Sequence, residues 1–284
     1  MKTQMISKRL ANNIYVPASI LLMLTLAASP VFALDFMGPP TSSYGQGRVS
    51  TGIDYSYSSM DLELTNGKWV DYLDGEFWGS GTAFSRNLKD FQMNRVYANL
   101  GFGLLDNLDA FVRLGAANAT FDDSLWGESE DFESHAEPAV GAGIRATFYE
   151  NENFALGALC QASWARFDGQ LDSPYWASAD YVEVDIAEIQ IALGTTVRLN
   201  DQVAIYGGPF FHFVDGSLED ELNTVDEVEP VLAKTRYSWD VEESSNFGAY
   251  VGASLNLNEN ASFNIEYQRT ADADAIALSF ARKF

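Results

Sequence analysis

Large apolar residues alternate with small or polar residues along much of the chain. In the C-terminal segment AIALSFARKF, Ile276, Leu278 and Phe280 carry large side chains, and the residues between them are small or polar. A period of two places the two sets on opposite faces of a β-strand. The pattern predicts a final strand with one apolar face and one polar face.

The same alternation recurs in about ten segments, an even number of the kind that closed bacterial barrels use. Examples are RVSTGIDYSYS, RVYANLGFGL, AFVRLGA, AVGAGIRATFY, FALGALCQASW and VAIYGGPFFHF, with further segments around residues 189–197, 247–257 and 263–267. We predict an all-β fold class: a closed antiparallel transmembrane β-barrel of about ten strands, with roughly eight to twelve as limits.

The expected connections alternate in length. Four are short, around residues 105–108, 150–153, 200–202 and 258–260, and most of the others are long and polar, around residues 59–90, 122–137, 168–181 and 215–243. Transmembrane barrels have short periplasmic turns and longer external loops, which favours this class. A lipocalin-like or sandwich protein remains the alternative, since it also buries one face of each strand.

The first 33 residues have the features of a secretory signal. Lys2, Lys8 and Arg9 precede the apolar run ILLMLTLAAS, and Val31 and Ala33 supply small residues before a cleavage point. We predict a signal peptide over residues 1–33, a Pro/Gly/Ser-rich periplasmic lead-in over residues 34–46 that could reach into the lumen, and the barrel over residues 47–284. A retained membrane anchor is the alternative for the first segment.

The charge balance is strongly acidic. The chain has 17 basic and 40 acidic residues, a net charge of −23. A protein that neutralises a nucleic-acid backbone needs a basic face, so we expect no nucleic-acid partner. Cys160 is the only cysteine, which rules out a disulfide within the chain and requires an exported fold that is stable without one.

The terminal SFARKF and the hairpins GFGLLDNLDAFVRLGA and VRLNDQVAIYGGPFF resemble the small outer-membrane β-barrel proteins of Gram-negative bacteria, the OmpA/OmpX-like and porin-like group. The resemblance implies location in the outer membrane, with its lipid and lipopolysaccharide as surroundings. It also implies that Phe280 and Phe284 form a signal read by the barrel-assembly machinery. We expect a departure from the two-domain OmpA pattern, because the sequence shows no peptidoglycan-binding segment after the last predicted strand.

Charged residues recur on the face predicted to point inward. The expected lumen cluster consists of Asp54, Arg95, Arg113, Arg145, Glu188 and Glu266. One interpretation is a charged constriction that selects permeating ions. The other, which we favour, is a salt-bridged polar core that fills a narrow barrel, since buried charges must be paired and a barrel of about eight to ten strands leaves little room.

One external segment is a candidate site for divalent cations, which prefer clustered carboxylate oxygens. Its acidic residues are Asp122, Asp123, Glu128, Glu130, Asp131 and Glu133, with no basic residue among them. The segment lacks the spacing of an EF-hand, so a solvated acidic surface is the competing interpretation.

These features predict a non-enzymatic barrel without a cofactor, either a narrow pore or a structural surface protein. If it conducts, the acidic external mouth should give a weak cation preference that fades with salt. The alternatives are an adhesin or ligand-binding barrel that uses its acidic loops, and an outer-leaflet hydrolase built on His212 with Asp215 or on His135.

Overall fold

The computed structural model describes residues 34–123, 130–171, 180–225, 232–243 and 246–284. The strands, in chain order, are β1 (Val49–Leu73), β2 (Glu76–Thr82), β3 (Arg86–Leu105), β4 (Leu108–Asp123), β5 (Glu130–Ser134), β6 (Glu137–Glu150), β7 (Phe154–Leu171), β8 (Asp180–Arg198), β9 (Val203–Val225), β10 (Leu232–Glu243), β11 (Phe247–Asn258), β12 (Ala261–Arg269) and β13 (Ala273–Lys283). Among the described residues there is no helix of the length and apolarity needed to cross a membrane.

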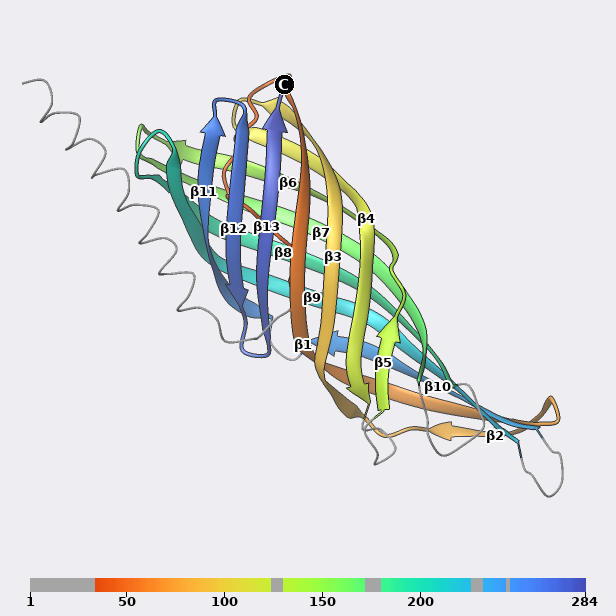
Figure 1. The fold of residues 1–284 in the computed structure, drawn as a ribbon. Coiled ribbons are helices and arrows are strands. Elements are labelled where there is room, and N and C mark those ends of the chain that lie inside the picture. Colours follow the sequence, from red (N-terminus) through yellow and green to blue (C-terminus); the bar gives the residue numbers. More distant parts are fainter. Residues whose placement is uncertain (1–33, 124–129, 172–179, 226–231, 244–245) are drawn as a thin grey trace, which may run out of the picture. The chain divides into compact units, whose positions relative to one another are not determined.

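Ten of these strands close into a ring (Figure 1). Strands β1, β3, β4, β6, β7, β8, β9, β11, β12 and β13 follow one another as antiparallel neighbours, and β13 pairs again with β1. The seam runs from Ser50, opposite Lys283, to Met60, opposite Ala273. The predicted antiparallel barrel of about ten strands is confirmed.

The four short connections predicted from the sequence are confirmed as tight turns at one end of this ring, where the C-terminus also lies (Figure 1). Asparagine side chains close three of these turns. Asn151 Oδ1 accepts hydrogen bonds from the amides of Asn153 and Phe154, Asn200 Oδ1 accepts from those of Gln202 and Val203, and Asn258 Oδ1 accepts from that of Asn260. Asparagine favours such turns because its side chain binds the backbone two residues on. Short turns mark the periplasmic end of outer-membrane barrels.

The outer face of the ten-strand ring is an apolar belt. Large side chains that are 38% to 65% exposed follow its strands, among them Ile53, Val96, Leu100, Val112, Leu114, Ile144, Ile189, Ile191, Leu193, Phe211, Val251 and Phe280. Opposite them, most inward positions are polar or small, and the larger inward side chains include Phe111, Leu159, Tyr206, Phe210 and Tyr250. This is the arrangement of a barrel with lipid outside and polar groups inside.

Aromatic residues with polar tips lie where this belt ends away from the turns, among them Tyr57, Trp164 and Tyr267. The Tyr57 hydroxyl donates to Gln92 Oε1 at 2.9 Å, Trp164 Nε1 donates to Asp185 Oδ1 at 2.8 Å, and the Tyr267 hydroxyl bonds Asp274. Rings of this kind suit the boundary between hydrocarbon and water, because one end is apolar and the other is wet.

Beyond this boundary the strands continue into a second, narrower ring. There β10 pairs with β9 and β1 and takes the place of β11, β12 and β13, while β5 pairs with β4 and β7 and takes the place of β6. The second ring therefore has eight strands: β1, β3, β4, β5, β7, β8, β9 and β10. The prediction of long loops over residues 59–90 and 215–243 is wrong, because most of these residues form β1, β2, β3, β9 and β10.

The polarity of the two faces is reversed between the rings. Along the inward face of β8, Val182, Val184 and Ile186 give way to Glu188 and Gln190, all of them buried. Along its outward face, Glu183 and Asp185 give way to the exposed Ile189, Ile191 and Leu193. The eight-strand ring thus has an apolar interior and a polar exterior, as expected for a β-barrel surrounded by water.

The interior of the eight-strand ring is filled by one apolar cluster. Its members include Met60, Leu62, Leu64, Leu88, Phe91, Phe121, Phe132, Phe167, Val184, Leu218, Trp239 and Val241, each at most 3% exposed. Phe121 stacks on Phe132 with ring centroids 4.5 Å apart, and Phe91 stacks on Phe121 at 5.7 Å. Eight strands leave an interior that side chains just fill, so this ring is a packed core.

The outer face of the eight-strand ring carries ion pairs between neighbouring strands. Arg166 on β7 pairs with Glu183 on β8, and Glu221 on β9 pairs with Lys234 and Arg236 on β10. The hydrogen bond from Lys234, together with that from Arg236, holds the pKa of the Glu221 carboxyl below its usual value. Charges of this kind are compatible with water and incompatible with hydrocarbon.

The position of the membrane can be tested by adding a charge to each outer face. We expect Leu193→Arg, in the middle of the apolar belt on β8, to lower the free energy of unfolding in lipid vesicles by about 2–4 kcal/mol. Glu219→Arg, on the exposed outer face of neighbouring β9, should change it by less than about 0.5 kcal/mol. Denaturant unfolding of both variants decides, and equal effects would contradict the assigned boundary.

Candidate functional site

The six charged residues predicted for the lumen all point into the ten-strand ring. Asp54, Arg95, Arg113, Arg145, Glu188 and Glu266 are 1% to 8% exposed and come from six strands: β1, β3, β4, β6, β8 and β12. They do not form one constriction. They lie in separate groups with different partners.

The first group lies next to the apolar core of the eight-strand ring. Arg95 pairs with Asp35 Oδ1 at 3.0 Å and binds Glu188 through two guanidinium nitrogens. Glu188 Oε2 lies 3.4 Å from His212 Nε2, and Glu243 Oε2 lies 2.6 Å from His212 Nδ1. These five buried side chains form a continuous line of opposite charges, provided that His212 carries a proton on each nitrogen.

His212 therefore points inward. The catalytic pairing with Asp215 is wrong, because Asp215 is exposed on the opposite face of β9 and His212 is fully buried. His135, the other histidine, is exposed just after β5.

Two members of this line, Asp35 and Glu243, were not predicted from the sequence. Asp35 belongs to the lead-in and Glu243 to a segment expected to be a loop, so neither lay on a predicted inward face. Glu243 could have been found from the alternation of residues in β10, which places Trp239, Val241 and Glu243 on the same face of the strand.

The lead-in enters the lumen, and its backbone is bound by lumen side chains. Glu266 accepts hydrogen bonds from the amides of Met37 and Gly38, each at 2.9 Å. Arg113 Nη2 donates to the carbonyl of Phe36 at 2.7 Å, and Gln268 Nε2 donates to that of Asp35 at 2.6 Å. Gly38 has a φ of 74°, a left-handed conformation that suits glycine.

Apolar contacts hold the same segment. Leu34 and Met37 are fully buried and pack in a cluster with Phe111, Tyr206 and Tyr250 inside the ten-strand ring. Nearer the turns, Asp109 accepts hydrogen bonds from Ser42 Oγ and from the amides of Ser43 and Tyr44. The lead-in is thus an ordered plug, which confirms the expectation that it reaches into the lumen.

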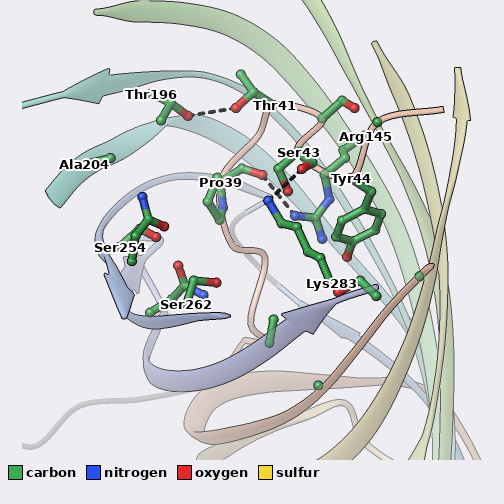
Figure 2. A pocket seen from close by; sticks show the side chains of 18 of the residues that line it. Pro39, Thr41, Ser43, Tyr44, Arg145, Thr196, Ala204, Ser254, Ser262 and Lys283 are labelled. Carbon is green, nitrogen blue, oxygen red and sulfur yellow. Dashed lines mark hydrogen bonds between the residues drawn. The ribbon is translucent and has the colours of Figure 1, made fainter. Parts of the chain in front are cut away.

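A cavity of about 740 Å³ remains between the plug and the barrel wall. It opens between the periplasmic turns, since residues of all four turns or their flanks line it, including Asp106, Glu152, Asn200 and Asn256. Figure 2 shows the plug residues Pro39, Thr41, Ser43 and Tyr44 on one side, with Arg145 and Lys283 beside them.

The acidic segment is only partly described. In the backbone register Asp122 lies opposite Asp131 and Asp123 opposite Glu130 at the end of the β4–β5 pair, and Glu133 is exposed. Glu128 lies outside the described residues. Within the described part of the chain no group of three or more His, Cys, Asp or Glu side chains is arranged to hold a metal ion. A divalent-cation site here stays a prediction.

No protein-family model matches the sequence, and no curated protein matches it either. Several solved structures are similar in fold. The outer membrane protease OmpT from Escherichia coli is 12% identical over 86% of this chain and 97% of its own, with a TM-score of 0.42. The outer membrane protein OprG from Pseudomonas aeruginosa is 15% identical over 85% and 98%, with a TM-score of 0.41.

The translocator domain of the autotransporter NalP from Neisseria meningitidis is 11% identical over 84% of this chain and 88% of its own, with a TM-score of 0.41. These likenesses concern the general architecture and transfer no residue role. The ten-strand ring, its apolar belt and its polar interior are by themselves those of a bacterial outer-membrane β-barrel.

The buried line of charges predicts a large difference between two arginines. Arg95→Met leaves Asp35 and Glu188 buried without their cation, so we expect it to lower the free energy of unfolding by about 3–5 kcal/mol. The control Arg166→Met removes the exposed partner of Glu183 and should cost at most about 1 kcal/mol. Urea unfolding in detergent micelles measures both values. Similar values for the two variants would show that the Arg95 group does not stabilise the fold.

The role of the terminal aromatic residue in assembly can be tested with a matched control. Phe284 is 65% exposed, and its amide donates to the carbonyl of Val49 across the seam. Phe148, near the same end of the barrel, is 64% exposed. We expect Phe284→Ala to reduce the yield of heat-modifiable, membrane-inserted protein, and Phe148→Ala to leave it nearly unchanged. Equal yields would refute a special role for Phe284.

Proposed function

We propose that this protein is a closed, non-enzymatic outer-membrane barrel that carries a β-stranded extension above the outer surface. The observation that supports this most is the packed eight-strand ring in line with the plugged ten-strand ring. A solute would have to displace both the lead-in and an apolar core that includes Leu64, Phe91 and Phe167. Apolar interiors are as densely packed as organic crystals, so this core leaves no water-filled path.

A non-enzymatic role is supported by the environment of the histidines. His212 is completely buried between two carboxylates at the base of the apolar core, where neither water nor a lipid substrate reaches it. A general base must come within hydrogen-bond reach of the proton that it abstracts. The geometry offers His212 a role as a bridge between buried charges.

Planar-bilayer conductance tests the closed state. We expect no steady current from the wild-type protein. We also expect none from a variant lacking residues 34–46, because the eight-strand ring stays packed when the plug is removed. A steady current from the wild type would favour the narrow-pore alternative, and reversal potentials across a KCl gradient would then show whether it prefers cations, as the acidic external face suggests.

A second candidate function, binding of a partner at the cell surface, is favoured by strand β2. Among the described strands β2 pairs with β1 alone, so its second edge is open, and Phe77, Trp78 and Phe84 are 64%, 73% and 86% exposed. Open edges with exposed aromatic residues accept added strands. Loss of surface binding in a Phe77→Ser, Trp78→Ser double variant, with binding retained in Phe148→Ala, would support this function.

A further inference from the structure

Three cations that line the cavity at the periplasmic end form no ion pair in the described part of the chain: the exposed Arg48, and Arg145 and Lys283. Of the other basic residues that line the cavity, Arg113 pairs with Asp54 and Arg198 pairs with Glu150. In the described part of the chain neither Arg145 nor Lys283 forms an ion pair. Both line the cavity, and Figure 2 shows the Arg145 guanidinium and the Lys283 ammonium close together beside Ser43 and Tyr44.

Arg145 is the more informative of the two, because it is only 8% exposed. Its Nη1 lies 3.5 Å from the carbonyl oxygen of Pro39, and its Nε has no hydrogen-bond partner. The guanidinium lies over the rings of Phe111 and Tyr44, with its central carbon 5.0 Å and 5.6 Å from the ring centroids. Aromatic faces and one long carbonyl contact do not replace a carboxylate for a buried charge.

Lys283 likewise has a neutral partner, the carbonyl of Ser43, which its Nζ reaches at 2.7 Å. Two buried carboxylates near these cations are already engaged. Asp109 is fully buried and binds Ser42, Ser43 and Tyr44 of the plug, while Asp54 is held by Arg113. Arg145 and Lys283 therefore face the same cavity without an ion pair to a carboxylate.

Charged residues also line the cavity, namely Arg48, Asp106, Glu152 and Asp201, and the remaining wall offers neutral hydrogen-bonding groups. Small hydroxyl and amide side chains line it: Asn99, Ser254, Asn256, Ser262, Asn264 and Ser279. The buried Oδ1 atoms of Asn99 and Asn264 have no hydrogen-bond partner. Such a wall suits a ligand with several hydroxyl groups, and the volume of about 740 Å³ lies within the range of small-molecule sites.

We propose that this cavity binds a small polyhydroxylated anion from the periplasm, a sugar whose carboxylate or phosphate group bridges Arg145 and Lys283. Its hydroxyl groups would meet the asparagine and serine side chains of the wall. Because Pro39, Ser43 and Tyr44 form part of the same wall, the bound anion also joins the plug to the barrel. This site does not depend on whether the barrel conducts.

Isothermal titration of the full-length mature barrel in detergent micelles tests the proposal. The probes are galacturonate, glucose 6-phosphate, neutral galactose and inorganic phosphate. We expect at least one anionic sugar to bind at least about tenfold more tightly than both galactose and inorganic phosphate, since a charged hydrogen bond and the hydroxyl contacts each contribute. Binding of galacturonate alone identifies a carboxylate ligand, and binding of glucose 6-phosphate alone identifies a phosphate ligand.

The residues are tested with three glutamine variants. Arg145→Gln and Lys283→Gln should each weaken the binding about tenfold or more, whereas Arg198→Gln, at the rim of the same cavity and paired with Glu150, should change it less than about twofold. If Arg145→Gln does not fold, Lys283→Gln and the loss of affinity with added salt carry the test. No binding of either anionic sugar, equal binding of galactose, or unchanged affinity in Lys283→Gln would overturn the proposal.

Discussion

The geometry of a β-strand fixes the side-chain period at two, whatever solvent surrounds the strand. Six strands of this protein, β1, β3, β4, β7, β8 and β9, belong to both rings. Apart from the irregularity between Leu88 and Phe91 on β3, the same series of alternate residues faces inward where these strands pass from one ring to the other. Only the chemistry of each side can change. Lipid around the ten-strand ring requires apolar side chains outside, and water around the eight-strand ring requires them inside. The reversal of polarity near Glu188 on β8 follows from these two requirements. It places the plug and the charged line inside the ten-strand ring and the apolar core inside the eight-strand ring.

The change from ten strands to eight sets what the interior can hold. A ten-strand ring is slightly too wide for wall side chains alone, and here the lead-in supplies the missing atoms together with the carboxylate of Asp35 for Arg95. The eight-strand ring needs no insert, because phenylalanine, leucine and methionine side chains meet across it. His212, held by Glu188 and Glu243, lies where the polar interior meets the apolar one.

The ten-strand ring could be predicted from sequence because its alternation is strong and its turns are short. All six lumen residues followed from counting along inward faces. The eight-strand ring was missed for a physical reason. On β8 the apolar residues occupy positions 189, 191 and 193 in one half and positions 182, 184 and 186 in the other, so the apolar series shifts by one residue. Such a shift looks like the end of a strand, although the strand continues and only its surroundings change. The plug contacts were also out of reach, since the lead-in has no periodicity that would assign its partners.

The length of β1 has a mechanical consequence. Its 25 residues make a continuous strand of about 80 Å, far longer than the hydrocarbon core of about 30 Å that it crosses. The same strand bonds to β3 and β13 in the ten-strand ring and to β10 and β2 in the extension. A lateral force on the tip of the extension is therefore transmitted to the barrel along the covalent backbone of β1. The hydrogen bonds between β1 and its four neighbouring strands share this load as shear. The extension is therefore anchored rigidly, because its base is part of the barrel wall.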